Sequence, residues 1–137
     1  MDSLSSEERS RQMALVRSKD TKPEIWVRKL VHAMGYRYRL HINELPGKPD
    51  LVFPKSKKVI FVHGCFWHRH HDVNCKLARL PKSRVDFWTK KLEDNRARDI
   101  AKHNQLLELG WEILIIWECQ LSKTELLKSR INTFLKL

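Results

Sequence analysis

The chain has 137 residues, a length typical of one compact domain. Its hydrophobic share of 42% argues against general disorder, and no apolar stretch is long enough to span a membrane. The net charge of +11 favours a polyanionic partner, and nucleic acid fits better than an anionic membrane because no segment pairs an apolar face with a basic one. With no secretory segment and three cysteines, an odd number, we expect a cytoplasmic protein associated with the nucleoid.

Helix-start motifs and hydrophobic periodicity divide the chain into elements. Residues 1–20 are polar and are predicted to form an N-terminal arm or short helix, with Ser5 and Glu8 in capping-box spacing. We expect residues 21–137 to form a single domain. Its first predicted elements are a helix over 21–34, strands over 36–42, 51–53 and 59–62, and an irregular segment over 63–81. They are followed by a long helix over 83–110, capped by Ser83 and Asp86 and broken near Asp94 and Asn95. The last predicted elements are a central buried strand over 111–117 and a final helix capped by Ser122 and Glu125.

This order predicts an α/β fold in which a mixed sheet is covered by helices on both faces. The same order of helices and strands forms the core of restriction-type endonucleases. Order alone is a weak argument for function, because one fold hosts many activities.

Asp50 is the first candidate for chemistry. It enters a predicted strand directly after Gly47-Lys-Pro, although Asp is disfavoured inside strands. A carboxylate held near backbone carbonyls is a good ligand for Mg²⁺. Taken alone, however, an Asp in a turn more often only caps that turn.

The segment from His63 to Cys75 contains four of the seven histidines and two of the three cysteines. It follows a predicted strand directly, so pairing of strands 51–53 and 59–62 would bring His63 close to Asp50. Histidines at such a position act as general bases, proton donors or electrostatic stabilisers.

The same segment offers soft metal ligands. Cys65, His70 and Cys75 are spaced by four residues each, and Cys119 could complete a tetrahedral Cys₃His zinc site, with His71 as the alternative histidine ligand. Such a closed site would be structural, because it leaves no open position for a substrate.

Aromatic residues also gather in and after this segment. Phe66 and Trp67 lie inside it, and Phe87 and Trp88 begin the next helix. These residues either belong to the core or form rigid wedges that enter base steps of DNA. Arg69, Lys76 and Arg79 are candidates for contacts with a groove of the DNA and equally for contacts with its phosphates.

Three strings together resemble the very short patch repair (Vsr) endonuclease family. They are Pro46-Gly-Lys-Pro-Asp50, Phe61-Val-His-Gly-Cys-Phe-Trp-His68 and Trp111-Glu-Ile-Leu-Ile-Ile-Trp-Glu-Cys119, and the likeness runs from about residue 11 to 121. The resemblance implies a restriction-endonuclease-like core with structural zinc. It also implies a Mg²⁺-dependent enzyme that nicks one DNA strand 5′ to the T of a T:G mismatch, the product of 5-methylcytosine deamination.

The resemblance also implies residue roles. Asp50 would bind the catalytic Mg²⁺, and Val62, where some members carry Thr, would keep a backbone carbonyl ligand. His68 would activate water, oriented by Asp99, while His63 assists at the phosphate and Glu24 holds water near the metal. The zinc ligands would be Cys65, His70, Cys75 and Cys119, and the residues intercalating beside the mismatch would be Phe66, Trp67, Trp88 and Met13.

Two other hypotheses use the same residues. One is a zinc-containing DNA-binding module without catalysis, and the other is a restriction-type nuclease that cuts matched DNA. The partner expected in the first place is double-stranded DNA with a T:G mismatch. A monomer suits this asymmetric substrate, and a mismatch-repair coupling protein is a further partner expected for the family.

Overall fold

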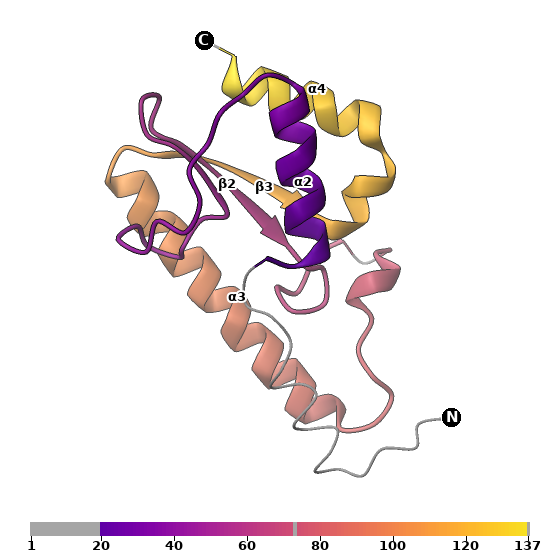
Figure 1. Cartoon of the computed structure of the whole chain (residues 1–137). Coiled ribbons are helices and arrows are strands. Elements are labelled where there is room, and N and C mark those ends of the chain that lie inside the picture. The colour runs from indigo at the N-terminus through magenta and orange to yellow at the C-terminus, as the bar shows by residue number, and fades with distance from the viewer. Residues whose placement is uncertain (1–19, 73, 137) are drawn as a thin grey trace.

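A computed structural model describes residues 20–72 and 74–136, and in it three strands form one mixed sheet (Figure 1). The strands are β1 (Leu51–Phe53), β2 (Lys58–His63) and β3 (Glu112–Trp117), arranged in the order β1-β2-β3. β1 runs antiparallel to β2, and β3 runs parallel to it. The parallel pair requires a crossover connection, which the long helix α3 supplies.

Helices cover both faces of this sheet, as predicted. α2 (Lys22–Ala33) and α4 (Thr124–Leu135) lie together on one face, and α3 (Val85–Glu108) crosses the other (Figure 1). Short 3₁₀ turns follow at Lys76–Ala78 and Glu118–Ser122. No helix among residues 20–72 and 74–136 combines the length and apolarity needed to cross a membrane.

The central strand β2 supplies core side chains to both layers. Ile60 and Val62 pack toward α2 and α4, whereas Val59 and Phe61 pack toward α3 with Leu106. This division follows from the alternation of side chains along a strand. All of β2 beyond its first residue is buried, so the residues that follow it start from a rigid position.

The predicted helix over 21–34 is confirmed, together with its cap. The hydroxyl of Thr21 accepts a hydrogen bond from the Glu24 N–H at 3.4 Å, and Pro23 stands in the first turn. Gly35 follows the helix with φ of 98°, a conformation that glycine adopts without strain.

The predicted strand over 36–42 is wrong. Within this segment only Arg39 pairs with a strand, in an isolated bridge to Val52. The backbone leaves the extended conformation at His41, which has φ of 57°, so no ladder can continue. Tyr36 then packs with the α2–α4 layer and Ile42 with the α3 layer, so the segment crosses from one side of the sheet to the other.

The prediction that residues 111–117 form the central strand is also wrong. β3 lies at an edge of the described sheet, and β2 takes the centre. The apolar run arises because both faces of β3 are covered by helices, although most of its side chains are only partly buried. Covering by helices on both faces produces the same sequence signal as a central position.

The predicted break in the helix near Asp94 and Asn95 is absent, because α3 is continuous. Both residues have partners outside the helix ladder: Asp94 lies 3.5 Å from Lys90, and the Asn95 amide donates to the Trp67 carbonyl at 3.1 Å. The predicted Ser83 cap is wrong too. The capping position is Arg84, in the left-handed region with φ of 55°, and no side chain caps the helix there.

The predicted cap of the last helix is wrong by one position. α4 is preceded by Lys123, which makes no side-chain capping bond. The Ser122 hydroxyl instead donates to the Cys119 carbonyl at 3.2 Å, and this ties it to the preceding turn. The capping box predicted at Ser5 and Glu8 lies outside the described residues.

Candidate functional site

Asp50 stands at the entrance to β1, where β2 fixes both its backbone and its side chain. Its N–H donates to the Ile60 carbonyl at 3.1 Å, and its carboxylate accepts from the Val62 N–H at 2.6 Å. Burial raises the pKa of Asp50 to about 7, reinforced by the nearby Glu24 carboxylate and opposed by the hydrogen bond from Val62. Ionisation of this buried carboxyl group is unfavourable by itself, and a nearby cation would stabilise the ionised form.

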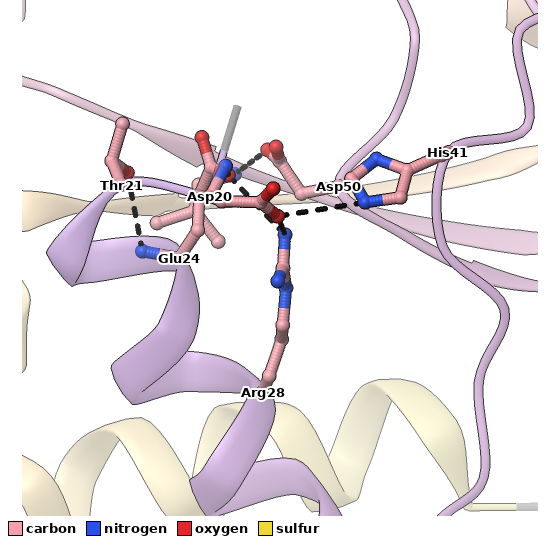
Figure 2. A network of polar contacts seen from close by, with 7 residues as sticks. Asp20, Thr21, Glu24, Arg28, His41 and Asp50 are labelled. Atoms are coloured by element: carbon pink, nitrogen blue, oxygen red, sulfur yellow. Dashed lines mark hydrogen bonds and ion pairs between the residues drawn. The ribbon is translucent and has the colours of Figure 1, made fainter. Parts of the chain in front are cut away.

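A polar network from the start of α2 surrounds Asp50 (Figure 2). Glu24 is only 5% exposed, and its carboxylate accepts from the Asp20 N–H at 2.6 Å. The Arg28 guanidinium contacts the Asp20 carboxylate at 2.8 Å and the Glu24 carboxylate at 3.5 Å, and His41 Nε2 lies 3.5 Å from Asp20. The network holds Glu24 beside Asp50.

Parallel imidazole rings lie next to these carboxylates. The rings of His63 and His68 are stacked, with centroids 4.0 Å apart and planes at 6°. His63 is 4% exposed, and its Nδ1 is buried without a hydrogen-bond partner among the described residues. Burial, and next the nearby His68, lower the pKa of His63 to about 3, so its ring is neutral at physiological pH.

His68 is oriented by a carboxylate on α3. Its Nδ1 lies 2.6 Å from the Asp99 carboxylate. Burial tends to raise the pKa of Asp99, but the hydrogen bond with His68 prevails and lowers it. Asp99 is therefore ionised and accepts the proton of Nδ1, which leaves His68 Nε2 available to take a proton from elsewhere.

A cavity of about 410 Å³ joins these groups. Its lining includes the expected catalytic side chains Glu24, Asp50, His63, His68 and Asp99, so the structure brings them together from four separate parts of the chain. It also includes residues that sequence reasoning missed, namely Arg28, His41, Lys48, Lys102 and His103. Helical spacing was the available signal for two of them, since Arg28 follows Glu24 by four residues and His103 follows Asp99 by four.

The predicted zinc ligands form a second cluster. The donor atoms of Cys65, His70, Cys75 and Cys119 lie within 4.8 Å of one another and could hold one metal ion. The Cys119 N–H donates to the Cys65 sulfur at 3.4 Å, and His70 Nδ1 lies 3.5 Å from the Cys119 sulfur. His71 is exposed and does not join the cluster, so the geometry favours His70 over the alternative.

The cluster is chemically suited to a metal rather than to free thiols. Cys65 is fully buried and Cys75 nearly so, and none of the three cysteines forms a disulfide. Burial raises the pKa of Cys65 above its usual range, so a positive ion is needed to make it a thiolate there. Trp117 stacks on His70 with centroids 4.2 Å apart and so fixes the plane of that ring.

The aromatic residues predicted as wedges pack against one another. The ring centroids of Phe66 and Trp67 are 5.1 Å apart, and Trp88 lies 5.4 Å from Phe66 and 6.1 Å from Trp67. We call these three residues the aromatic cluster. All three are partly exposed. Met13, the fourth predicted wedge, lies outside the described residues.

The basic residues near the cluster divide into two kinds. Arg69 is engaged within the chain, since its guanidinium donates to the Ala78 carbonyl at 3.2 Å and lies 3.5 Å from Glu93. It therefore braces the loop that carries Cys65, His70 and Cys75 against α3. Lys76 and Arg79 are exposed and remain candidates for contacts with DNA.

Comparison with known proteins agrees with this arrangement. The family described as DNA mismatch endonuclease Vsr matches residues 1–75. Type II nicking enzyme V.XorIIP of Xanthomonas oryzae pv. oryzae is 50% identical over 98% of this chain and 96% of its own length, and Type II nicking enzyme V.NmeAIP of Neisseria meningitidis is 38% identical over 98% and 94%. DNA mismatch endonuclease Vsr of Escherichia coli is 41% identical over 91% of this chain and 78% of its own length. With the cavity and the metal cluster in view, the conclusion is that this chain belongs to the Vsr family of DNA mismatch endonucleases.

Proposed function

We propose that this protein is a Mg²⁺-dependent endonuclease that nicks one strand of duplex DNA 5′ to the T of a T:G mismatch. The observation that carries the proposal is the convergence of Asp50, His68 and Asp99 on one cavity. Relatives named as nicking enzymes and as a mismatch endonuclease support the reaction class. In this function the enzyme starts very short patch repair of deaminated 5-methylcytosine.

The carboxylates of the cavity fit a hard divalent cation. Asp50 and Glu24 are held near each other in a buried site, an arrangement that a nearby positive charge stabilises. Asp50 and the backbone carbonyl of Val62 would hold Mg²⁺. When bound, the ion would withdraw charge from the phosphate oxygens and so favour attack on phosphorus.

The protein's own residues handle the proton and the water. His68 Nε2 would take a proton from the attacking water, because Asp99 holds the ring in the tautomer with the proton on Nδ1. The neutral His63 would donate a hydrogen bond to the phosphate, and its parallel stacking on His68 keeps both rings in place. Glu24, held by Asp20 and Arg28, would orient a water molecule beside Asp50.

The Cys₃His cluster fits zinc. Three sulfur atoms and one imidazole nitrogen form the donor set of closed structural zinc sites. We propose that zinc there ties the loop after β2 to the turn after β3. This loop carries His68 and part of the aromatic cluster, so the metal would fix the position of the catalytic base relative to the wedges.

The aromatic cluster supports mismatch recognition. We propose that Phe66, Trp67 and Trp88 enter the duplex beside the mismatch, and that Met13 does so from the N-terminal arm. A T:G pair is less firmly held than a matched pair, so unstacking costs less there. This difference would give a preference for the mismatch before any base edge is read.

The remaining expectations complete the proposal. Residues 21–137 would form one nuclease domain with a restriction-endonuclease-like core, and residues 1–20 an arm that contacts DNA. A monomer suits a substrate without symmetry and a single nick. The protein would act on cytoplasmic, nucleoid DNA, where a mismatch-repair coupling protein would be its further partner.

Strand-resolved cleavage of a labelled duplex tests this function. The zinc-loaded full chain is incubated in Mg²⁺ with a T:G duplex and a matched T:A duplex, beside Asp50→Ala and the exposed control Asp86→Ala. We expect a nick only in the T strand of the mismatch, a loss of roughly a thousandfold or more in Asp50→Ala, and no change in the control. Circular dichroism checks that both variants fold.

Other outcomes would replace the proposal. Equal cutting of both duplexes would indicate a nuclease without mismatch specificity. Tight binding without cleavage in any divalent metal would indicate a DNA-binding module.

A further inference from the structure

The cavity that holds Asp50 has a cationic side that the proposed reaction does not use. Lys48 and Lys102 line it where the loop before β1 meets α3, with His103 beside Lys102 on the same helix, and we call the two lysines the cationic wall. His41 and Arg28 also line the cavity but already contact Asp20. The cationic wall therefore calls for its own explanation.

Gly47 lets the loop that carries Lys48 pack closely against α3 at Lys102. It has φ of 76°, and a Cβ at this position would lie 3.1 Å from the Cβ of Lys102 and 3.3 Å from the Phe61 ring. The loop can thus press against α3 only because this residue has no side chain. Lys48 follows immediately, with its own backbone in the left-handed region at φ of 50°. Lysine rarely adopts this backbone conformation, so its presence at this position suggests a functional reason.

Neither lysine is neutralised within the protein. Among the residues that the structure describes, the ammonium groups of Lys48 and Lys102 have no hydrogen-bond or ion-pair partner, and both residues are exposed. The carboxylates that line the same cavity are engaged elsewhere, Asp99 with His68 and Glu24 with Arg28, so the two ammonium groups are free to attract an anion. A phosphate matches this chemistry, because its oxygens accept hydrogen bonds from ammonium groups.

His103 connects the cationic wall to the catalytic rings. Its ring is nearly parallel to that of His63, with centroids 5.6 Å apart and planes at 15°, and it packs on Phe61 at 4.6 Å. It also follows Asp99 by one helical turn on α3. Burial lowers the pKa of His103 despite the nearby Asp99, so it offers a neutral N–H rather than a charge.

We propose that Lys48, Lys102 and His103 bind the backbone phosphate next to the scissile one on the nicked strand. The stacked rings of His68, His63 and His103 lead from the catalytic base to this second phosphate. Binding there would fix the register of the strand, so that the scissile phosphate lies at Asp50 and His68. The inference rests on the proposed nicking function and assigns these three residues to substrate positioning.

The test removes charge from the protein and from the DNA in turn. The protein variants are Lys48→Gln, Lys102→Gln and the control Lys55→Gln, whose lysine lies in the turn at the opposite end of β2. Each is tested with a series of T:G duplexes, and each duplex carries a single neutral methylphosphonate at one position around the nick. Nicking is measured as kcat and KM in Mg²⁺. Binding is measured by fluorescence anisotropy at several salt concentrations.

We expect Lys102→Gln to raise KM about tenfold with kcat changed less than about threefold, and to lower the salt slope of binding by about one. At one position adjacent to the nick, the methylphosphonate should weaken binding by the wild type but add nothing in Lys102→Gln or Lys48→Gln. Lys55→Gln should behave as the wild type at every position.

The inference would be overturned if the loss of affinity from the lysine substitution multiplied the loss from the methylphosphonate at every neighbouring position. That result would mean that the lysines do not contact those phosphates. A wild type that binds the duplex without nicking it would contradict the proposed function instead. The anisotropy measurements would then decide the phosphate subsite by themselves.

Discussion

At the scale of single residues, Asp50 shows how function opposes stability. Its carboxylate keeps one strong hydrogen bond, from the Val62 N–H, yet it is placed away from water and beside Glu24. Ionisation is therefore unfavourable in the folded protein without a cation. The same placement would make the carboxylate an effective metal ligand, since a bound cation would remove this electrostatic penalty.

Replacing Asp50 with Asn should therefore stabilise the metal-free protein. The folded-state pKa of Asp50 is raised from 3.8 to about 7, so the wild type loses stability as pH rises between these values. Asn keeps an acceptor for the Val62 N–H but carries no charge. At pH 8 without divalent metal, Asp50→Asn should unfold a few degrees above the wild type, and the difference should narrow toward pH 5. Thermal unfolding followed by circular dichroism measures both.

Nicking should be lost in the same variant, because the amide is a poor ligand for Mg²⁺. A melting temperature at pH 8 that is equal to or below that of the wild type would show that the carboxylate is not under electrostatic strain.

At the scale of elements, strand register explains why the metal cluster forms. β2 and β3 run parallel with His63 opposite Trp117, so both strands end at the same edge. Cys65 lies two residues beyond His63, and Cys119 lies two residues beyond Trp117. For this reason the two cysteines lie close together, and the loop that follows Cys65 supplies His70 and Cys75.

Loss of one proposed zinc ligand should weaken the connection between the loop after β2 and the turn after β3. We expect Cys119→Ser to hold less zinc and to melt roughly 10 °C or more below the zinc-loaded wild type, because metal binding contributes directly to folding free energy. His71→Ala is the matched control and should keep both zinc content and melting temperature. Metal analysis and thermal unfolding provide the measurements, and equal zinc loss in both variants would contradict the assignment of His70.

At the scale of the whole molecule, α3 unites the functional parts. It carries Trp88 to the aromatic cluster, Asp99 to His68, and Lys102 and His103 to the cavity, all along one continuous helix (Figure 1). A break near Asp94 would have separated Trp88 from Asp99. The continuity of α3 would therefore link the proposed mismatch binding to the proposed catalytic base.

The aromatic cluster should decide substrate choice rather than general affinity. Stacking of a base on an aromatic side chain contributes about 1–3 kcal/mol, so Trp67→Ala should reduce the preference for T:G over T:A by about tenfold or more. Binding to the matched duplex should change little. Competition binding measures the ratio, with the exposed Trp26→Ala on α2 as control. An unchanged ratio in a folded Trp67→Ala protein would mean that these rings serve packing alone.

Much of this protein could be predicted because its signals are local. The start of α2 is encoded by Thr21, Pro23 and Glu24 within one turn, and its end by Gly35. The Cys and His residues of the possible metal cluster and the aromatic pair Phe66-Trp67 stand out in the sequence, because a solvent-exposed loop does not need such residue types to stay soluble. The mixed α/β class followed from hydrophobic runs separated by helical periods.

The errors arose where contacts distant in sequence override local pattern. Alternation over 36–42 predicts a strand, but the positive φ at His41 lets the chain cross between layers. The apolar run over 111–117 indicates that helices cover both faces of this strand. It does not indicate whether the strand lies at the centre or at the edge of the sheet.

The sequence by itself determined the charge and predicted the α/β class and the Cys/His cluster, because these depend on residue type and hydrophobic pattern, while the roles of the candidate catalytic residues were implied by the resemblance to the Vsr family. Only the tertiary structure decided that His70 rather than His71 joins the cluster, since the choice depends on where the loop places each ring. It alone brought Arg28, Lys48, Lys102 and His103 to the cavity, since these residues meet through packing of α2, α3 and the loop before β1. Proximity between distant segments is set by the fold, and no local pattern of residues encodes it.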